Sequence, residues 1–215
     1  EEEIGPLLRA RGWTLATAES ATGGLVGHLV TNVAGSSDYF LGGVVAYHND
    51  AKMALLGVRL ETLVAVGAVS EEVAREMARG ARTRLNADVA VSTTGIAGPG
   101  GSTSEKPVGL TYIAVSSADD EVCRRYVFEG DRLANKEQAA EEALRLVCEH
   151  LKGRTMVEFV NEPVTVEVQQ RPGEPSRPLA FTWRGLRYVV ASWGREGEET
   201  YDGDAFYCYL VQTEG

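Results

Sequence analysis

Short apolar runs alternate with helix-spaced segments over the first two-thirds of the chain. The short runs have the length and composition of strands buried in a sheet, and they cover residues 13–18, 42–47, 87–93, 108–116 and 121–128. In the other segments apolar residues recur every three or four positions, the spacing of a helix. These helix-spaced segments cover residues 4–11, 25–33, 50–56, 70–85 and 135–151. Strands that alternate with helices predict a three-layer α/β/α sandwich with a mixed, largely parallel sheet.

The pattern changes near residue 153. Beyond it the chain is strand-like and aromatic, with turn residues between apolar runs at 157–168, 179–183, 186–193 and 206–211. We therefore expect two domains, a larger one at residues 1–153 and a small all-β domain at residues 156–215, joined by a short linker.

The composition narrows the class of protein. No apolar run approaches the roughly 20 residues that span a bilayer, and the net charge of −10 opposes non-specific binding to nucleic acid or anionic membrane. Three cysteines and three histidines are scattered without the spacing of a disulfide framework or a metal site. We expect a cytoplasmic protein with reduced thiols, no metal and no cofactor.

A hydroxyl follows the first predicted strand. In the segment 18–24 (AESATGG), Ser20 stands at the strand end, and Gly23 and Gly24 precede a helix. Unpaired N–H groups at such a helix start can hold a phosphate or a developing oxyanion, and glycines let a ligand approach the backbone. Ser20 is therefore a candidate nucleophile, although the same residues also suit a serine that only caps the helix.

A candidate base follows the second predicted strand. Tyr47 closes that strand, and Lys52 lies in the helix after it. A serine nucleophile needs a base, and no histidine–carboxylate pair stands in a suggestive position. A partly desolvated lysine with a neutral amine can serve instead. The alternative for Lys52 is an ordinary solvated cation.

Two further segments follow strand ends. Residues 95–107 (GIAGPGGSTSEKP) are too rich in glycine and proline for regular structure, and they lack the Walker and dinucleotide-binding patterns. Ligands of open α/β sheets bind at strand ends, so this loop is either a cradle for a phosphate or nucleotide or a flexible surface loop. Arg132, in the segment 128–132 (FEGDR), is either a surface cation or a bidentate partner for phosphate or carboxylate.

Together these segments resemble the C-terminal domain of the CinA family, the nicotinamide-nucleotide amidases. The matching segments, in the family's order and spacing over about residues 4–152, are TAES-TGG at 17–24, AGSSDYF–GGVVAYHNDAK at 34–52, LGV-ETL–GAVSEEVAREMARGA at 56–81, TTGIAGPGG–EKPVG at 93–109 and FEGDR at 128–132. The resemblance implies hydrolysis of the carboxamide of nicotinamide mononucleotide to nicotinate mononucleotide and ammonia.

The resemblance also implies roles for individual residues. Ser20 would be the nucleophile, forming an acyl-enzyme ester, and Lys52 its base. Tyr47 and Thr94 would line the site and assist proton transfer or substrate orientation. Glycine N–H groups would meet the oxyanion or the phosphate, with Arg132 as an anion partner. The residues expected to bind substrate are Thr22, Gly23, Gly24, Asn49, Gly95 and Arg132.

The sequence departs from the family at two positions. The family usually has cysteine after the serine, where this chain has Ala21, so a mechanism that depends on that thiol is excluded. His48 stands where a small hydroxyl residue is common; we expect it to face solvent, and the alternative is a modifier of substrate fit. Many relatives carry an N-terminal domain similar to molybdopterin-biosynthesis proteins. The sequence has no counterpart of it, and we do not expect its metal-dependent activity here.

One alternative to an amidase is a non-catalytic nucleotide-binding or regulatory module, but the joint presence of Ser20, Tyr47, Lys52 and Thr94 favours the enzyme. In the C-terminal domain, aromatic residues interleaved with arginines at 177–188 suit either a small barrel core or stacking on single-stranded nucleic acid. The acidic residues that follow favour the barrel core. We expect a small-molecule nucleotide substrate, no nucleic-acid or membrane partner, and a homo-oligomer.

Overall fold

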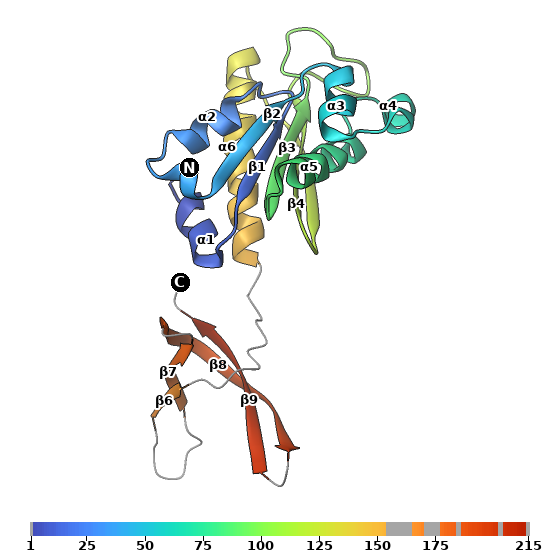
Figure 1. Cartoon of the computed structure of the whole chain (residues 1–215). Helices are drawn as coiled ribbons and strands as arrows, with labels where there is room; N and C mark the ends of the chain where they lie inside the picture. The colour runs from blue at the N-terminus through green and yellow to red at the C-terminus, as the bar shows by residue number, and fades with distance from the viewer. Residues whose placement is uncertain (1, 154–164, 170–176, 184–185, 202–203, 214–215) are drawn as a thin grey trace. The chain divides into compact units, whose positions relative to one another are not determined.

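Figure 1 shows a computed structural model of the chain, which describes residues 2–153, 165–169, 177–183, 186–201 and 204–213. Contacts within the chain divide it into two units, residues 1–154 and residues 155–215. Each unit contains its own sheet, five-stranded in the first and four-stranded in the second.

The first unit is built on a sheet with the strand order β2-β1-β3-β4-β5. β1 (Leu15–Glu19) lies between β2 (Phe40–Val45) and β3 (Val89–Gly95) and is parallel to both. β4 (Leu110–Ser117) and β5 (Glu121–Val127) continue the sheet as an antiparallel hairpin. The mixed sheet predicted from the sequence is confirmed, with its parallel strands on one side and the hairpin on the other.

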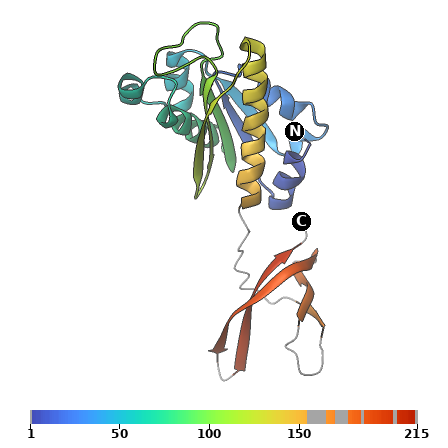
Figure 2. The same ribbon diagram turned by 180° about the vertical axis from the view of Figure 1, so that it is seen from behind.

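Helices cover both faces of this sheet, as Figures 1 and 2 show. One face carries α1 (Ile4–Arg11), α2 (Leu25–Thr31) and α6 (Arg132–Gly153), and the other carries α3 (Asn49–Leu56) and α5 (Glu71–Leu85). A separate apolar core fills each side. The predicted three-layer α/β/α sandwich is confirmed. None of the described helices combines the length and apolar character that a bilayer span requires.

Two short elements are not predicted by the sequence pattern: η1 (Ser36–Asp38) and α4 (Leu60–Val66). Within α4 only Thr62 is buried, while Leu60 and Val64 are exposed. Leu63 packs against the core beneath α4, but seven residues are too few for the apolar spacing to stand out as a helix signal.

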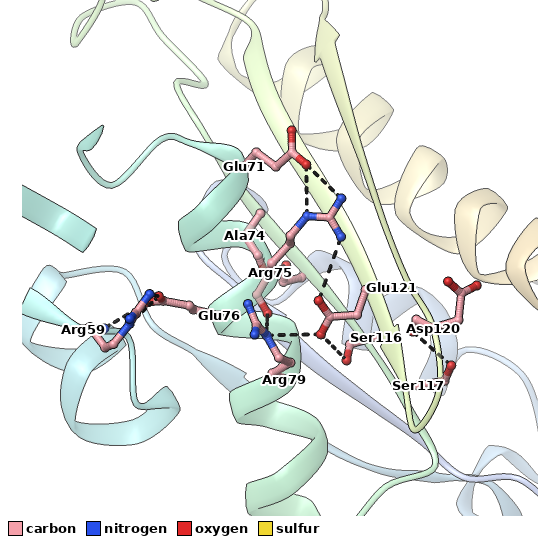
Figure 3. A network of polar contacts seen from close by, with 11 residues as sticks. Arg59, Glu71, Ala74, Arg75, Glu76, Arg79, Ser116, Ser117, Asp120 and Glu121 are labelled. Atoms are coloured by element: carbon pink, nitrogen blue, oxygen red, sulfur yellow. Dashed lines mark hydrogen bonds and ion pairs between the residues drawn. The ribbon is translucent and has the colours of Figure 1, made fainter. Parts of the chain in front are cut away.

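Charged side chains tie α5 to the hairpin of β4 and β5, as Figure 3 shows. The helix begins as predicted, with Ser70 Oγ accepting a hydrogen bond from Val73 N at 3.4 Å. Arg75 and Arg79 both approach the Glu121 carboxylate on β5, at 3.9 and 3.1 Å. Ion pairs this accessible contribute about 0–1 kcal/mol each, so they orient α5 more than they stabilise the fold.

α3 and α5 approach each other most closely at Gly80. A Cβ atom placed there would stand 1.9 Å from the carbonyl oxygen of Leu56, the last residue of α3. The two helices therefore meet backbone to backbone, and a side chain at position 80 would push α3 outward. Since α3 carries Lys52, the position of that lysine depends on this glycine.

The second unit is an antiparallel sheet with the order β6-β7-β8-β9. Its strands are β6 (Thr165–Gln169), β7 (Arg177–Trp183), β8 (Leu186–Tyr201) and β9 (Asp204–Thr213). β8 runs well past the expected end at residue 193, with a register irregularity between Arg195 and Gly197. The expected strand residues 157–164 lie outside the described residues.

We predict that Gly80→Ala lowers the free energy of unfolding by about 1–3 kcal/mol, because the new methyl group overpacks against Leu56. Urea unfolding followed by circular dichroism measures the change. Gly100→Ala is the matched control, since a Cβ there meets no atom within 4 Å. Equal stabilities of the two variants would contradict the close helix contact.

Candidate active site

Ser20 and Lys52 lie against each other. Ser20 directly follows β1, and Lys52 lies in the first turn of α3. Lys52 Nζ donates to Ser20 Oγ at 2.9 Å, across 32 positions of sequence. Both residues are buried, with 8% of Ser20 and 2% of Lys52 exposed. A candidate nucleophile and a candidate base therefore share one buried contact.

Among the described residues, the Lys52 amine has only uncharged partners. It also donates to the carbonyl oxygens of Ala46 at 3.0 Å and Tyr47 at 3.4 Å. Burial disfavours the charged form and lowers the pKa of Lys52 below its ordinary value. A lysine with a lowered pKa is more often neutral near pH 7, and only the neutral amine can accept the Ser20 proton.

Other nucleophiles and metal ligands are poorly placed in the described part of the chain. Burial raises the pKa of Cys123 to about 12 and also raises the pKa of Cys148, which keeps both thiols protonated. No three His, Cys, Asp or Glu side chains of the described residues gather closely enough to hold a metal ion.

The start of α2 is occupied by a carboxylate from within the chain. Glu19, at the end of β1, is 2% exposed. Its Oε2 accepts from the N–H groups of Gly24 at 2.8 Å and Val26 at 3.0 Å, and its Oε1 accepts from Gly27 N–H at 2.8 Å. The expectation that the Gly24 N–H is open to a phosphate or an oxyanion is therefore wrong. Glu19 already supplies the negative charge that this helix start favours.

Thr22 is buried with Glu19 instead of lining a cavity. Its side chain is fully buried, and its hydroxyl contacts Glu19 Oε2 and Thr93 Oγ1, both at 2.7 Å. Thr22 is one of the residues expected to bind substrate, and these internal contacts engage its hydroxyl.

Free N–H groups remain in the turn itself. Ser20 N–H donates to the Thr93 carbonyl at 2.9 Å within the sheet. None of the hydrogen bonds among the described residues uses the N–H groups of Ala21, Thr22 or Gly23. Gly23 has a φ of +64°, in the left-handed region that favours glycine. These three N–H groups are therefore candidates for the oxyanion donors expected near Ser20.

Tyr47 and Arg132 meet beyond the carboxyl ends of the parallel strands. Arg132 Nη2 donates to the Tyr47 hydroxyl at 2.7 Å, and Arg132 Nη1 donates to the Gly98 carbonyl at 2.8 Å. Arg132 also lines a pocket of about 470 Å³ between residues 97–99 and 130–133. The connection after β2, the glycine-rich loop and the start of α6 are therefore held together by one guanidinium group.

Thr94 and Gly95 end β3 beside the Ser20 turn. Thr94 is 1% exposed, and its hydroxyl donates to the Ala68 carbonyl at 2.7 Å, so its only proton is engaged in holding the segment before α5. At Gly95 a Cβ would stand 2.6 Å from the Leu110 carbonyl oxygen. Glycine is required here by the close approach of β4, whatever its role toward substrate.

Asn49 and His48 start α3 at the surface. Asn49 is exposed, and no hydrogen bond of its side chain occurs among the described residues. His48 is exposed too, as expected, and its Nδ1 accepts from Asp50 N–H at 3.3 Å as the helix cap. The ring nitrogen thus caps the start of α3, as the oxygen of a small hydroxyl residue would at this position.

The sequence reasoning missed two side chains that hold the glycine-rich loop. Lys106 Nζ donates to the carbonyls of Val66 and Val69, at 2.7 and 2.8 Å. Asn135 Nδ2 donates to the carbonyls of Ala97 and Gly130, at 3.0 and 3.1 Å. Except for Gly130, the carbonyls that they bind are distant in sequence, so no local pattern predicts these contacts.

The larger unit matches one known family and the smaller unit another. Residues 1–151 match the family model of the CinA C-terminal domain, and residues 155–203 match that of a domain of unknown function, DUF6504. The CinA-like protein of Chloroherpeton thalassium is 54% identical over 155 residues, which are 70% of this chain and 37% of that protein. The CinA-like protein of Salinibacter ruber is 54% identical over 144 residues, 67% of this chain and 35% of that protein. The chain thus spans little more than a third of the length of these curated relatives.

Solved structures agree with this match. A competence-damaged protein (CinA) superfamily protein from Klebsiella pneumoniae has a TM-score of 0.68 at 36% identity, covering 71% of this chain and 95% of that one. The competence/damage inducible protein CihA from Agrobacterium tumefaciens has a TM-score of 0.65 at 39% identity, covering 70% of this chain and 96% of that one.

We predict that Lys52→Met changes how stability depends on pH. The pKa of Lys52 is lower in the folded than in the unfolded chain, so folding releases protons between the two values and stability rises with pH across that window. Above the pKa of a lysine in the unfolded chain, about 10.4, stability no longer rises with pH. Urea unfolding from pH 7 to 10.5 should therefore show a smaller rise for Lys52→Met than for the wild type.

Lys152→Met is the control for this comparison. Lys152 is exposed on α6, and its pairing with Glu3 raises rather than lowers its pKa. This variant should keep the wild-type rise. A rise of the same size in Lys52→Met would show that burial does not depress the pKa of Lys52.

Proposed function

The chain belongs to the CinA family, and we propose that it is a serine amidohydrolase that acts on the carboxamide of nicotinamide mononucleotide. The products are nicotinate mononucleotide and ammonia. The observation that carries the proposal is the buried 2.9 Å contact between Lys52 Nζ and Ser20 Oγ. A Ser–Lys pair is a known variant of the serine nucleophile and its base.

The first chemical step is attack by Ser20. The neutral Lys52 amine takes the hydroxyl proton as Oγ bonds to the carboxamide carbon, and the carbonyl oxygen becomes an oxyanion. The free N–H groups of residues 21–23 adjoin the nucleophile, and they supply hydrogen bonds to that oxyanion. Removing one such donor costs about 2.7–4 kcal/mol in other enzymes, so the turn geometry matters as much as the hydroxyl.

The second step releases ammonia. The Lys52 ammonium gives its proton to the amide nitrogen, the C–N bond breaks, and an ester remains on Ser20. A water molecule then gives a proton to the neutral Lys52 and attacks the ester carbon. As the carboxylic acid leaves, Ser20 Oγ takes the proton back from Lys52. The pair returns to its starting state, and no further reactant is consumed.

Tyr47 and Arg132 are the groups best suited to hold the substrate over this pair. Arg132 uses one N–H on each terminal nitrogen, for Tyr47 and Gly98, so other N–H groups of its guanidinium remain for an anionic group. Tyr47 is 61% exposed and can move as substrate enters. The Thr94 hydroxyl donates its proton to the Ala68 carbonyl and so holds the segment before α5. Toward substrate this hydroxyl can therefore only accept a hydrogen bond.

A non-catalytic nucleotide-binding module is the second candidate function. Binding alone requires neither a hydroxyl nucleophile nor an uncharged amine. Burying Lys52 without a carboxylate partner among the described residues also opposes folding, since a desolvated amine loses hydration without gaining an ion pair. Catalysis gives a reason for that arrangement, and binding gives none.

We predict that Ser20→Ala lowers the rate of ammonia release from nicotinamide mononucleotide by at least about a thousandfold, because the attacking oxygen is removed. Titration calorimetry should show that this variant still binds the nucleotide. Ser36→Ala is the matched control: Ser36 is also buried and forms no side-chain hydrogen bond among the described residues. Wild-type turnover by Ser20→Ala would overturn the assignment of the nucleophile.

A further inference from the structure

Two cations stand one helical turn apart at the start of α6. Residues four apart on a helix share a face, so Arg132 and Lys136 are neighbours. Lys136 reaches the turn that follows Ser20, since its Nζ lies 3.7 Å from where a Cβ on Gly23 would stand. One face of α6 thus directs positive charge from the Tyr47 contact to the nucleophile turn.

The Lys136 ammonium has no partner in the described part of the chain. It is half-buried, and none of the hydrogen bonds or ion pairs found there includes it. The carboxylates nearby have other partners. Asp131 Oδ1 accepts from the N–H groups of Leu133 and Ala134, both at 2.9 Å, and Glu19 accepts from the start of α2. Lys136 therefore keeps its donors for a ligand.

An anionic ligand cannot use the start of α2. Glu19 fills that position with its own carboxylate, which repels a second anion there. Arg132 has spent part of its hydrogen-bonding capacity on Tyr47 and Gly98. Asn135 fixes this end of α6 to the glycine-rich loop through the Ala97 carbonyl, so the cations stand on a braced helix end.

From this placement we infer that Lys136, together with Arg132, forms the anion subsite of the active site and selects amide substrates that carry a phosphate monoester. The inference rests on the proposed function and adds to it a specificity-determining residue. Lys136 binds the phosphate, and the carboxamide lies over Ser20 and Lys52. A neutral nucleoside with the same carboxamide leaves the Lys136 charge unpaired and binds more weakly.

The test compares two substrates that differ only in the phosphate, nicotinamide mononucleotide and nicotinamide riboside. Ammonia release gives kcat/KM for each with the wild type, Lys136→Ala, Lys136→Arg and the control Lys152→Ala. Lys136→Ala should lower the ratio of the two kcat/KM values, mononucleotide over riboside, by about tenfold or more, through KM for the mononucleotide. Lys136→Arg should recover most of the ratio, and Lys152→Ala should keep it.

A purely structural role for Lys136 predicts a different result. Loss of packing would lower both kcat/KM values alike and leave their ratio unchanged, and that outcome overturns the inference. If Lys136→Ala keeps both the wild-type rates and the wild-type ratio of the two kcat/KM values, the inference is overturned as well.

Binding separates this inference from the proposed reaction. Titration calorimetry of nicotinamide mononucleotide into Ser20→Ala and into Ser20→Ala/Lys136→Ala needs no turnover. Should the wild type release no ammonia from either substrate, the proposed reaction fails, while binding weakened about tenfold or more in the double variant still supports Lys136. Equal affinities of the two proteins, or no binding by either, overturn its role.

Discussion

The first unit is organised around a lysine amine that lies buried against a serine hydroxyl, with no carboxylate of the described residues to neutralise it. Such burial opposes folding, since a charged amine loses its hydration. The chain tolerates it by placing the carbonyls of Ala46 and Tyr47 around Nζ and by letting α3 meet α5 at Gly80. The same desolvation that destabilises the charged amine makes its neutral form available as a base.

Glu19 imposes the second constraint on the site. One buried carboxylate accepts hydrogen bonds from the start of α2 and so fixes the turn that carries Ser20. It also closes that helix start to anions from outside. Because Glu19 occupies that helix start, the two anions of the proposed substrate complex use other groups. The N–H groups of residues 21–23 remain for the small oxyanion, and the cations of α6 remain for a larger anionic group.

Much of this arrangement could be predicted from the sequence. Strong periodicity located β1, β3, α5 and α6. The pairing of Ser20 with Lys52 followed from the need of a serine nucleophile for a base and from the resemblance to a family. The buried role of Glu19 was not predicted, because a carboxylate beside a glycine turn is usually exposed. The structure shows its side chain turned inward. The partner of Thr94 and the position of Lys136 beside the turn after Ser20 depend on chain segments distant in sequence, so no local pattern could supply them.

The most direct measurement is the titration of Lys52 in the folded protein, observed through its ε-carbon by NMR with carbon-13-labelled lysine. Loss of one signal in a Lys52 variant assigns the resonance. The structure requires a pKa below the ordinary lysine range, while exposed lysines such as Lys152 titrate within or above that range. A Lys52 signal that titrates with the exposed lysines would contradict the buried, partly neutral amine on which the proposed chemistry depends.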